Sequence, residues 1–126
     1  MKKPLKVLAL LYDPLSQSTY SRIKQLDSEK LLRDMREIID CDLVTCTEIE
    51  VEGKYFDVWS DDAALLSDKP IPNLYICEGL IIFGNLLFAK SGEDGEMLGL
   101  NHYEVQLLWK FISEQFPKLQ NYLGRL

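Results

Sequence analysis

The chain has 126 residues, of which 47% are hydrophobic and 27% charged, and its 14 basic and 20 acidic side chains give a net charge of −6. This length fits one domain that buries a core without disulfides or metal, and the composition excludes a disordered or fibrous protein. The negative charge disfavours nucleic acid as a direct ligand and favours basic protein surfaces as partners.

The cysteine content and the first residues indicate where the protein works. Three cysteines are present, and Pro4 and Lys6 interrupt the apolar segment that a secretory signal would need. We therefore expect a cytoplasmic protein with reduced thiols and no membrane association.

The first third of the chain predicts one strand and one helix. Lys6–Tyr12 is apolar and stops at a proline, which predicts a strand, whereas the polar stretch Leu15–Leu26 predicts a loop or an irregular extended segment. Asp27 is a candidate helix cap. The helix after it has one apolar stripe, made of Leu31, Leu32, Met35, Ile38 and Ile39.

The next segment predicts a β-hairpin followed by a loop. Leu43–Val51 alternates, so that Val44, Cys46, Glu48 and Glu50 share one side of a strand, and Tyr55–Trp59 pairs back across a turn at Gly53. Residues 60–73 contain two prolines and predict a structured loop in which Leu65 and Leu66 are packed inside.

The centre of the core is predicted at Cys77–Lys90, where two apolar runs flank Gly84 and Asn85. Such runs are typical of strands buried on both faces or of a buried hairpin, and 14 residues are too few to cross a bilayer. The acidic, glycine-containing stretch Ser91–Glu96 predicts a turn.

The last helix has a complete start signal. Asn101 is the expected N-cap, Glu104 completes a capping box, and Pro117 is expected to end the helix, which gives a helix over about 101–116 and a tail over 117–126. Its expected buried stripe comprises Val105, Leu108, Trp109, Ile112 and Phe116. The fold class is a single α+β domain over 1–126, a mainly antiparallel sheet covered by two α-helices on one side.

No reactive centre assembles from the residue types present. His102 is the only histidine and stands at an exposed helix start, so we expect no enzyme. Cys41, Cys46, Cys77 and His102 are the right ligand types for zinc but lack a C-x2-C spacing, and the turn at 91–96 lacks the ligand order of an EF-hand. We expect no cofactor, and a zinc-binding or small-ligand protein is the alternative.

Protein binding is the remaining possibility, because tyrosines beside acids are common interface residues. The candidate protein-binding residues are Asp61, Asp62, Glu93, Asp94, Glu96 and Tyr103. For Trp59 and Trp109, we expect packing in the core.

Several short motifs of the chain belong together: Asp57-Val58-Trp59-Ser60-Asp61-Asp62, Leu65-Leu66, Pro72-Asn73, Gly79 and Ile82-Phe83-Gly84-Asn85. With these motifs the chain resembles the domain-of-unknown-function family 3846, and the resemblance covers Lys6 to about Glu96. Ala63 and Ala64 depart from the family pattern where a glycine is usual, and Leu74 departs where an arginine is frequent. The resemblance implies a phage or mobile element of Gram-positive bacteria, and it brings no catalytic residue.

These observations predict a non-enzymatic protein that binds and inhibits a host protein with a basic surface. The setting implied by the resemblance favours a nucleic-acid-handling defence effector as that host protein, in the manner of an anti-CRISPR protein. A homo-oligomeric scaffold, assembled through the last helix and the tail, is a further alternative.

Overall fold

The strand at the centre of the fold is β7 (Leu86–Ser91), in a computed structural model that describes residues 4–67, 70–77 and 79–125. Its first four residues, Leu86 to Ala89, have no exposed surface. β7 lies between β1 (Pro4–Asp13) and β4 (Lys54–Asp61), with antiparallel pairing on both sides. The predicted centre of the core is therefore confirmed for the second of its two apolar runs.

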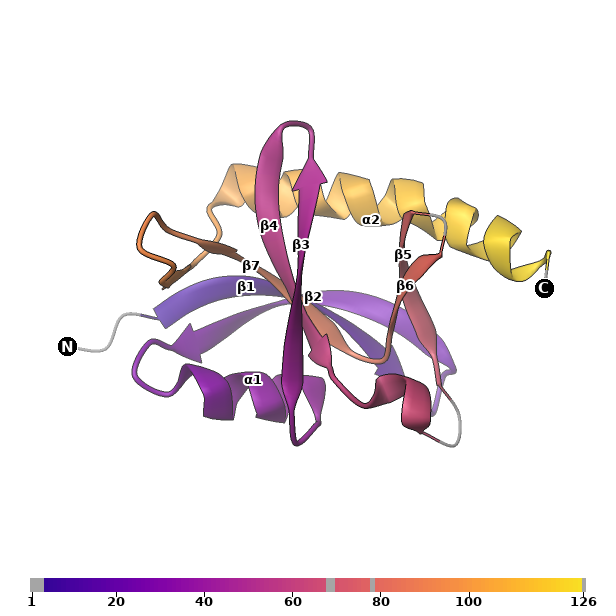
Figure 1. The fold of residues 1–126 in the computed structure, drawn as a ribbon, viewed down its shortest axis with the longest axis horizontal. Coiled ribbons are helices and arrows are strands. Elements are labelled where there is room, and N and C mark those ends of the chain that lie inside the picture. Colours follow the sequence, from indigo (N-terminus) through magenta and orange to yellow (C-terminus); the bar gives the residue numbers. More distant parts are fainter. Residues whose placement is uncertain (1–3, 68–69, 78, 126) are drawn as a thin grey trace.

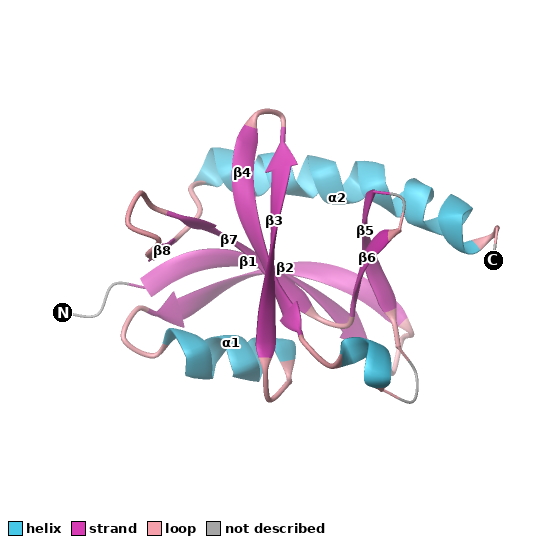
Figure 2. Ribbon diagram, in the orientation of Figure 1, coloured by secondary structure: helices cyan, strands magenta, loops and turns pink. Residues whose placement is uncertain are grey.

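The main sheet has the order β2-β1-β7-β4-β3, and the two-residue strand β8 (Met97–Leu98) pairs with the end of β7 (Figure 2). Among the described strands, β2 (Ser18–Asp27) and β3 (Val44–Val51) form its two edges. β3 and β4 make the predicted hairpin, with Val51 opposite Lys54 at the turn.

The strand β2 corrects the prediction of a loop over Leu15–Leu26. It pairs with β1 over ten residues, although Leu26 is its only residue that is buried. An edge strand of a sheet exchanges backbone hydrogen bonds with one neighbour and needs few apolar side chains. The polar composition of β2 therefore gave no strand pattern in the sequence.

The first apolar run of the predicted core belongs to a different sheet. β6 (Leu80–Phe83) pairs with β5 (Pro72–Cys77) in a separate two-stranded sheet. The chain turns from β6 into β7 at Gly84, which has a φ of 76° and donates its N–H to the carbonyl of Ile71 at 2.7 Å. The two runs are thus neighbours in sequence without forming a hairpin with each other.

The two helices cover opposite faces of the sheet, which corrects the expectation that both lie on one side (Figure 1). α1 (Leu31–Ile39) packs Met35 and Ile39 on one face, and α2 (His102–Leu123) packs Val105 and Leu108 on the other. Successive residues of a strand point to opposite faces, so strands that are apolar throughout, such as β7, need a cover on each face. The α+β class itself is confirmed.

The start of α1 differs from the prediction. Its N-cap residue is Lys30, and the cap has no side-chain hydrogen bond. Asp27 lies before the helix, where its carboxylate accepts from the N–H of Glu29 at 3.0 Å. The carboxylate of Asp34 in turn accepts from the N–H of Asp27 at 2.7 Å and from Arg33. A residue of the first helical turn thus ties the preceding strand to α1.

The capping box of α2 is confirmed. Asn101 Oδ1 accepts from the N–H of Glu104, and Glu104 Oε1 accepts from the N–H of Asn101, both at 2.8 Å. The predicted end at Pro117 is wrong, because α2 continues through this proline to Leu123. Leu119, which is 3% exposed, packs two residues beyond the proline and holds the last turns in place.

Some predicted core residues face solvent. Trp109 is 39% exposed and Phe116 is 60% exposed, because the buried stripe of α2 runs instead through Val105, Leu108, Gln115 and Leu119. In the loop after β4, Leu65 and Leu66 are 64% and 86% exposed, whereas Ala64 is the buried residue of the short 3-10 helix η1 (Ala64–Leu66). The expectation that Leu65 and Leu66 are packed is therefore wrong.

Candidate functional site

The acidic residues predicted to bind protein lie in two separate places. Asp61 ends β4 and Asp62 follows it, whereas Glu93, Asp94 and Glu96 lie in the turn between β7 and β8. β4 and β7 are antiparallel, so the two groups stand at opposite ends of these strands, about 20 Å apart at ~3.3 Å per residue. They do not form one continuous cluster.

Each of the two groups has its own surroundings. Asp61 lines a broad depression that also contains Arg36 and Asp40, and its carboxylate accepts from the N–H of Ala63 at 2.9 Å. Tyr103 is 77% exposed in the first turn of α2, with its ring centroid 5.9 Å from that of His102. The charges around Asp61 are mixed, which leaves its local field weaker than the sequence suggests.

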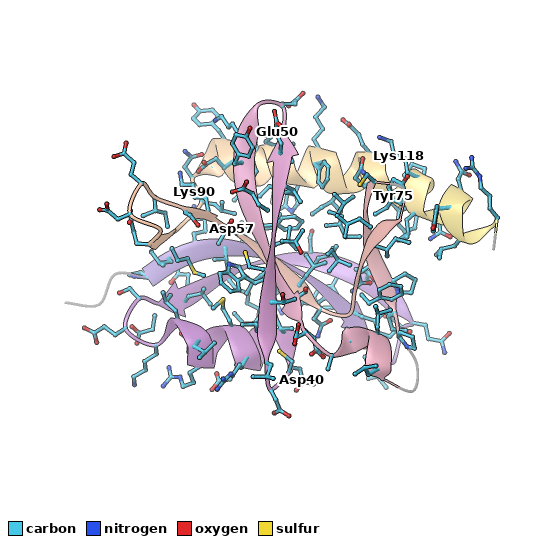
Figure 3. All side chains as sticks on the ribbon, in the orientation of Figure 1. Asp40, Glu50, Asp57, Tyr75, Lys90 and Lys118 are labelled. Carbon is cyan, nitrogen blue, oxygen red and sulfur yellow. The ribbon has the colours of Figure 1, made fainter. Side chains whose placement is uncertain are left out.

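A third group of acids comes together on the face of the sheet that α1 partly covers. Three cross-strand pairs of the β3–β4 hairpin share this face: Cys46 with Trp59, Glu48 with Asp57, and Glu50 with Tyr55. We call the surface formed by these six residues the open acidic face. Figure 3 shows Glu50 and Asp57 on β3 and β4. Directly opposed residues of an antiparallel pair point to the same side of a sheet, so these three carboxylates are close neighbours.

The open acidic face is exposed and has no basic residue from its own strands. Glu48, Glu50 and Tyr55 are exposed because α1 packs mainly on β2, β4 and β7 and leaves β3 uncovered. Within the described parts of β3, β4 and β7, the two lysines point to the other face, where Lys90 binds Glu104 and Lys54 is opposite Val51. The negative charge of this face is therefore uncompensated by its own strands.

Two buried polar groups at the base of this face differ in their hydrogen bonding. Asp57 is only 8% exposed, and its carboxylate accepts a hydrogen bond from the hydroxyl of Ser91. In the part of the chain that the structure describes, no lysine or arginine forms an ion pair with it, and the indole N–H of Trp59 is buried without a hydrogen-bond partner. A buried donor without a partner costs about 1–3 kcal/mol, so the indole of Trp59 carries a stability penalty.

The thiol of Cys46 responds to the same environment. Burial of the thiol, the negative charge of Asp57 and hydrogen bonding to Asp57 raise its pKa to about 11. The group is therefore a neutral thiol at physiological pH, although part of the residue is exposed. A protonated thiol is a poor nucleophile, so the arrangement does not activate Cys46 for catalysis.

Comparison with known proteins identifies the family. The family model described as "Domain of unknown function (DUF3846)" matches residues 7–114. The chain belongs to this family. Neither the curated proteins nor the solved structures contain a match to it. The match extends the resemblance seen in the sequence from about Glu96 into α2, and it assigns no activity.

The family residues noted in the sequence occupy defined places in this DUF3846 domain. Asp57 and Trp59 belong to the open acidic face, and Asn85 lies at the corner before β7. There Asn85 accepts from the N–H of Tyr12 at 2.8 Å and donates to the carbonyl of Ile39 at 3.2 Å. Asn85 thus links β1 to the end of α1, which is a structural role.

The thiols and the histidine of the DUF3846 domain do not assemble as a zinc site. Cys41 follows α1, Cys46 lies in β3 and Cys77 ends β5, while His102 starts α2. Across residues 4–67, 70–77 and 79–125, no three His, Cys, Asp or Glu side chains gather in a way that would hold a metal ion. No helix in the described part combines the length and apolar character that crossing a bilayer needs.

Sequence reasoning missed Glu48 and Glu50 as candidate site residues. The alternation of Leu43–Val51 already placed both on one side of a strand. Their importance depends on β3 being the outermost described strand and on α1 leaving that strand uncovered, and both facts follow from strand order. A single strand pattern contains no information on its neighbours in a sheet.

Proposed function

We propose that this DUF3846 domain is a non-enzymatic binding protein that covers a basic surface on another protein. The observation that carries the proposal is the open acidic face, where Glu48, Glu50 and Asp57 lie together without a basic residue from β3, β4 or β7. Complementary charge speeds the encounter of two proteins and selects the partner. Tyr55, 61% exposed in the same face, supplies apolar contact area of the kind that anchors interfaces.

We propose that the partner is a host protein that handles nucleic acid. A surface that binds phosphates is basic, so a protein with a net charge of −6 that occupies this surface would exclude nucleic acid from it. The phage or mobile-element setting that the family resemblance implies supports a host defence effector as the target, inhibited as anti-CRISPR proteins inhibit theirs. On this proposal the domain acts in the host cytoplasm.

The acids predicted from the sequence extend this surface in the proposal. Glu93, Asp94 and Glu96 continue the negative potential beyond β7, and Asp61 and Asp62 continue it at the other end of β4. Rim charges of this kind mainly change the association rate and the salt dependence of binding. Tyr103, in the first turn of α2, would contribute apolar contact to a partner that also reaches the face covered by α2.

Charge reversal tests the proposal. Tagged domain is used to capture partners from lysate of a Gram-positive host, in three forms with the same change in net charge: Glu48→Lys/Glu50→Lys, Asp61→Lys/Asp62→Lys and Glu93→Lys/Asp94→Lys. We expect the first variant to lose the captured partner and the other two to retain it with weaker binding. Capture that is unchanged in all three folded variants would refute an electrostatic interface.

A further inference from the structure

The strand β3 is an open sheet edge. It pairs with β4 through eight consecutive residues without a register shift, and no other described strand pairs with it. Figure 1 looks onto this edge, and β3 crosses in front of the other strands without being covered by them. Each strand at a sheet edge leaves half of its backbone N–H and carbonyl groups available to a further strand.

The two edges of the sheet differ in charge. In natural proteins, a lysine, a proline or a bulge in an edge strand usually prevents a further strand from pairing with it. The edge strand β2 has such charged residues, Arg22 and Lys24. β3 contains none of these devices, and its only charged residues are Glu48 and Glu50. An acidic edge repels a second copy of itself and attracts a basic strand.

The other side of β3 borders a hollow with a mixed lining. Thr45 and Thr47 line this cavity of about 160 Å³ together with apolar residues of η1 and β6, among them Leu65 and Ile81, and its remaining lining is polar, from Ser60, Asp61 and Asp62. Leu65, which the sequence predicted to be packed, is 64% exposed beside this cavity. A strand placed next to β3 would therefore have carboxylates along one face, and along the other it would reach the apolar side chains of η1 and β6.

We propose that β3 is a strand-addition site for an extended segment of the partner protein in which basic and apolar residues alternate. The backbone of this segment would hydrogen-bond to the outer edge of β3, its lysines or arginines would lie beside Glu48 and Glu50, and its apolar residues would enter the hollow at Thr45 and Thr47. In strand addition the backbone supplies affinity, and the alternate side chains supply specificity. This inference rests on the proposed function and states how the partner is held.

The experiment uses the whole domain and a synthetic octapeptide of alternating lysine and valine with blocked ends. Binding is measured by calorimetry, and backbone amide shifts are recorded by NMR. We expect the largest shifts in Val44–Val51. A peptide of the same sequence with every second amide N-methylated keeps its charge but loses the donors of one edge, and it is expected to bind at least tenfold more weakly.

Two further comparisons separate charge from pattern. A peptide of the same composition with its lysines and valines in two blocks is expected to bind at least tenfold more weakly than the alternating peptide. Glu48→Lys/Glu50→Lys is expected to abolish binding, while the matched variant Glu29→Lys/Glu37→Lys, with the same net charge and both changes outside the proposed surface, retains it within threefold. Amide spectra of both variants verify that they are folded.

The outcomes distinguish the two proposals. Equal affinity for the N-methylated peptide, or shifts confined to other strands, overturns strand addition but leaves an acidic binding surface in place. Absence of peptide binding, combined with loss of the lysate partner in Glu48→Lys/Glu50→Lys, overturns strand addition alone. Absence of peptide binding with unchanged partner capture in that variant overturns both.

Discussion

Two buried carboxylates of this DUF3846 domain have different surroundings. Glu104 is 6% exposed and receives two hydrogen bonds of 2.9 Å from Lys90 and one of 2.8 Å from the N–H of Asn101. Asp57 is 8% exposed and receives the Ser91 hydroxyl without an ion pair among the described residues. Glu104 is therefore a stabilising residue, whereas Asp57 has no cationic partner among the described residues.

The environment of Glu104 predicts a specific pH dependence. Burial alone would raise its pKa, but the hydrogen bonds from Asn101 and Lys90, with the charges of Lys90 and Lys54, lower the pKa below 4.5. A carboxyl with a lowered folded pKa contributes stability that is present above the unfolded pKa and is lost as pH falls through the folded pKa. The contribution is thus complete at neutral pH and is lost as the pH falls from about 4.5 through the lowered folded pKa.

We expect Glu104→Gln to lower the free energy of unfolding by about 2 kcal/mol at pH 7, because Lys90 loses its charged partner while glutamine preserves the capping box. Urea denaturation between pH 3 and 7 measures this, and the difference between variant and parent should shrink toward pH 3. Glu93→Gln, in the exposed turn, is the control that should leave stability unchanged. A difference that is constant with pH would contradict the ion pair.

The raised pKa of Cys46 predicts slow alkylation. With a pKa of about 11 in place of 9.0, the thiolate fraction at pH 8 falls about a hundredfold, and the thiolate is the reacting species. We expect iodoacetamide to modify Cys46 about a hundredfold more slowly in the folded domain than in urea, and Asp57→Asn to speed the folded reaction. Cys77, which is exposed, is the internal reference. Equal rates in folded and unfolded chains would contradict the desolvated thiol.

At the scale of elements, α2 shows how packing overrides a local stop signal. Pro117 lacks the N–H that the carbonyl of Ser113 would receive, and a proline in a helix interior costs about 3 kcal/mol. The helix nevertheless continues for six residues because Leu119 packs on the core and Gln115 donates to the carbonyl of Tyr75 at 2.8 Å. Contacts with the β5–β6 sheet therefore hold the second half of α2.

We expect Pro117→Ala to raise the free energy of unfolding by about 1–3 kcal/mol, since alanine supplies the missing donor and is the best helix former. Chemical denaturation monitored by circular dichroism is the measurement. Lys118→Ala, at the next and exposed position, should change stability by less than about 0.5 kcal/mol. If Pro117→Ala instead lowers the free energy of unfolding, the packing of the proline contributes more stability than the added backbone hydrogen bond would.

At the scale of the whole molecule, a helix covers the central strands on each face of the sheet, but both of its described edges stay open. α1 and α2 cover opposite faces, whereas β2 and β3 each have one described neighbour. Exposed edges are sites of unwanted pairing between copies of a protein, and like charges directly opposite each other oppose such pairing. Glu48 and Glu50 would meet their own copies if two β3 strands paired antiparallel.

We therefore expect Glu48→Thr/Glu50→Thr to associate through β3 more strongly than the parent protein does. Light scattering and sedimentation at increasing concentration measure the association. Glu93→Thr/Asp94→Thr loses the same charge away from the edge and should behave as the parent does. Equal association of the two variants would attribute the effect to net charge and not to the edge.

Local elements with short-range signals are predicted correctly from the sequence. The capping box of Asn101 and Glu104, the hairpin at Gly53, the apolar strand at Leu86–Ala89 and the α+β class are all confirmed, because each depends on residues that lie within a few positions of one another. The strand at Ser18–Asp27 was missed, since its hydrogen bonds to β1 replace the apolar pattern that usually identifies a strand.

The relations between these elements are visible only in the folded domain. Strand order places β3 at an edge and separates β6 from β7. Successive side chains of the buried strands point to opposite faces, so α1 and α2 are needed on opposite faces to cover them. The open acidic face and the separation of Asp61 from Glu93 follow from that order. Local sequence patterns specify how a segment folds, but pairing between distant segments depends on contacts that a pattern in one segment does not contain.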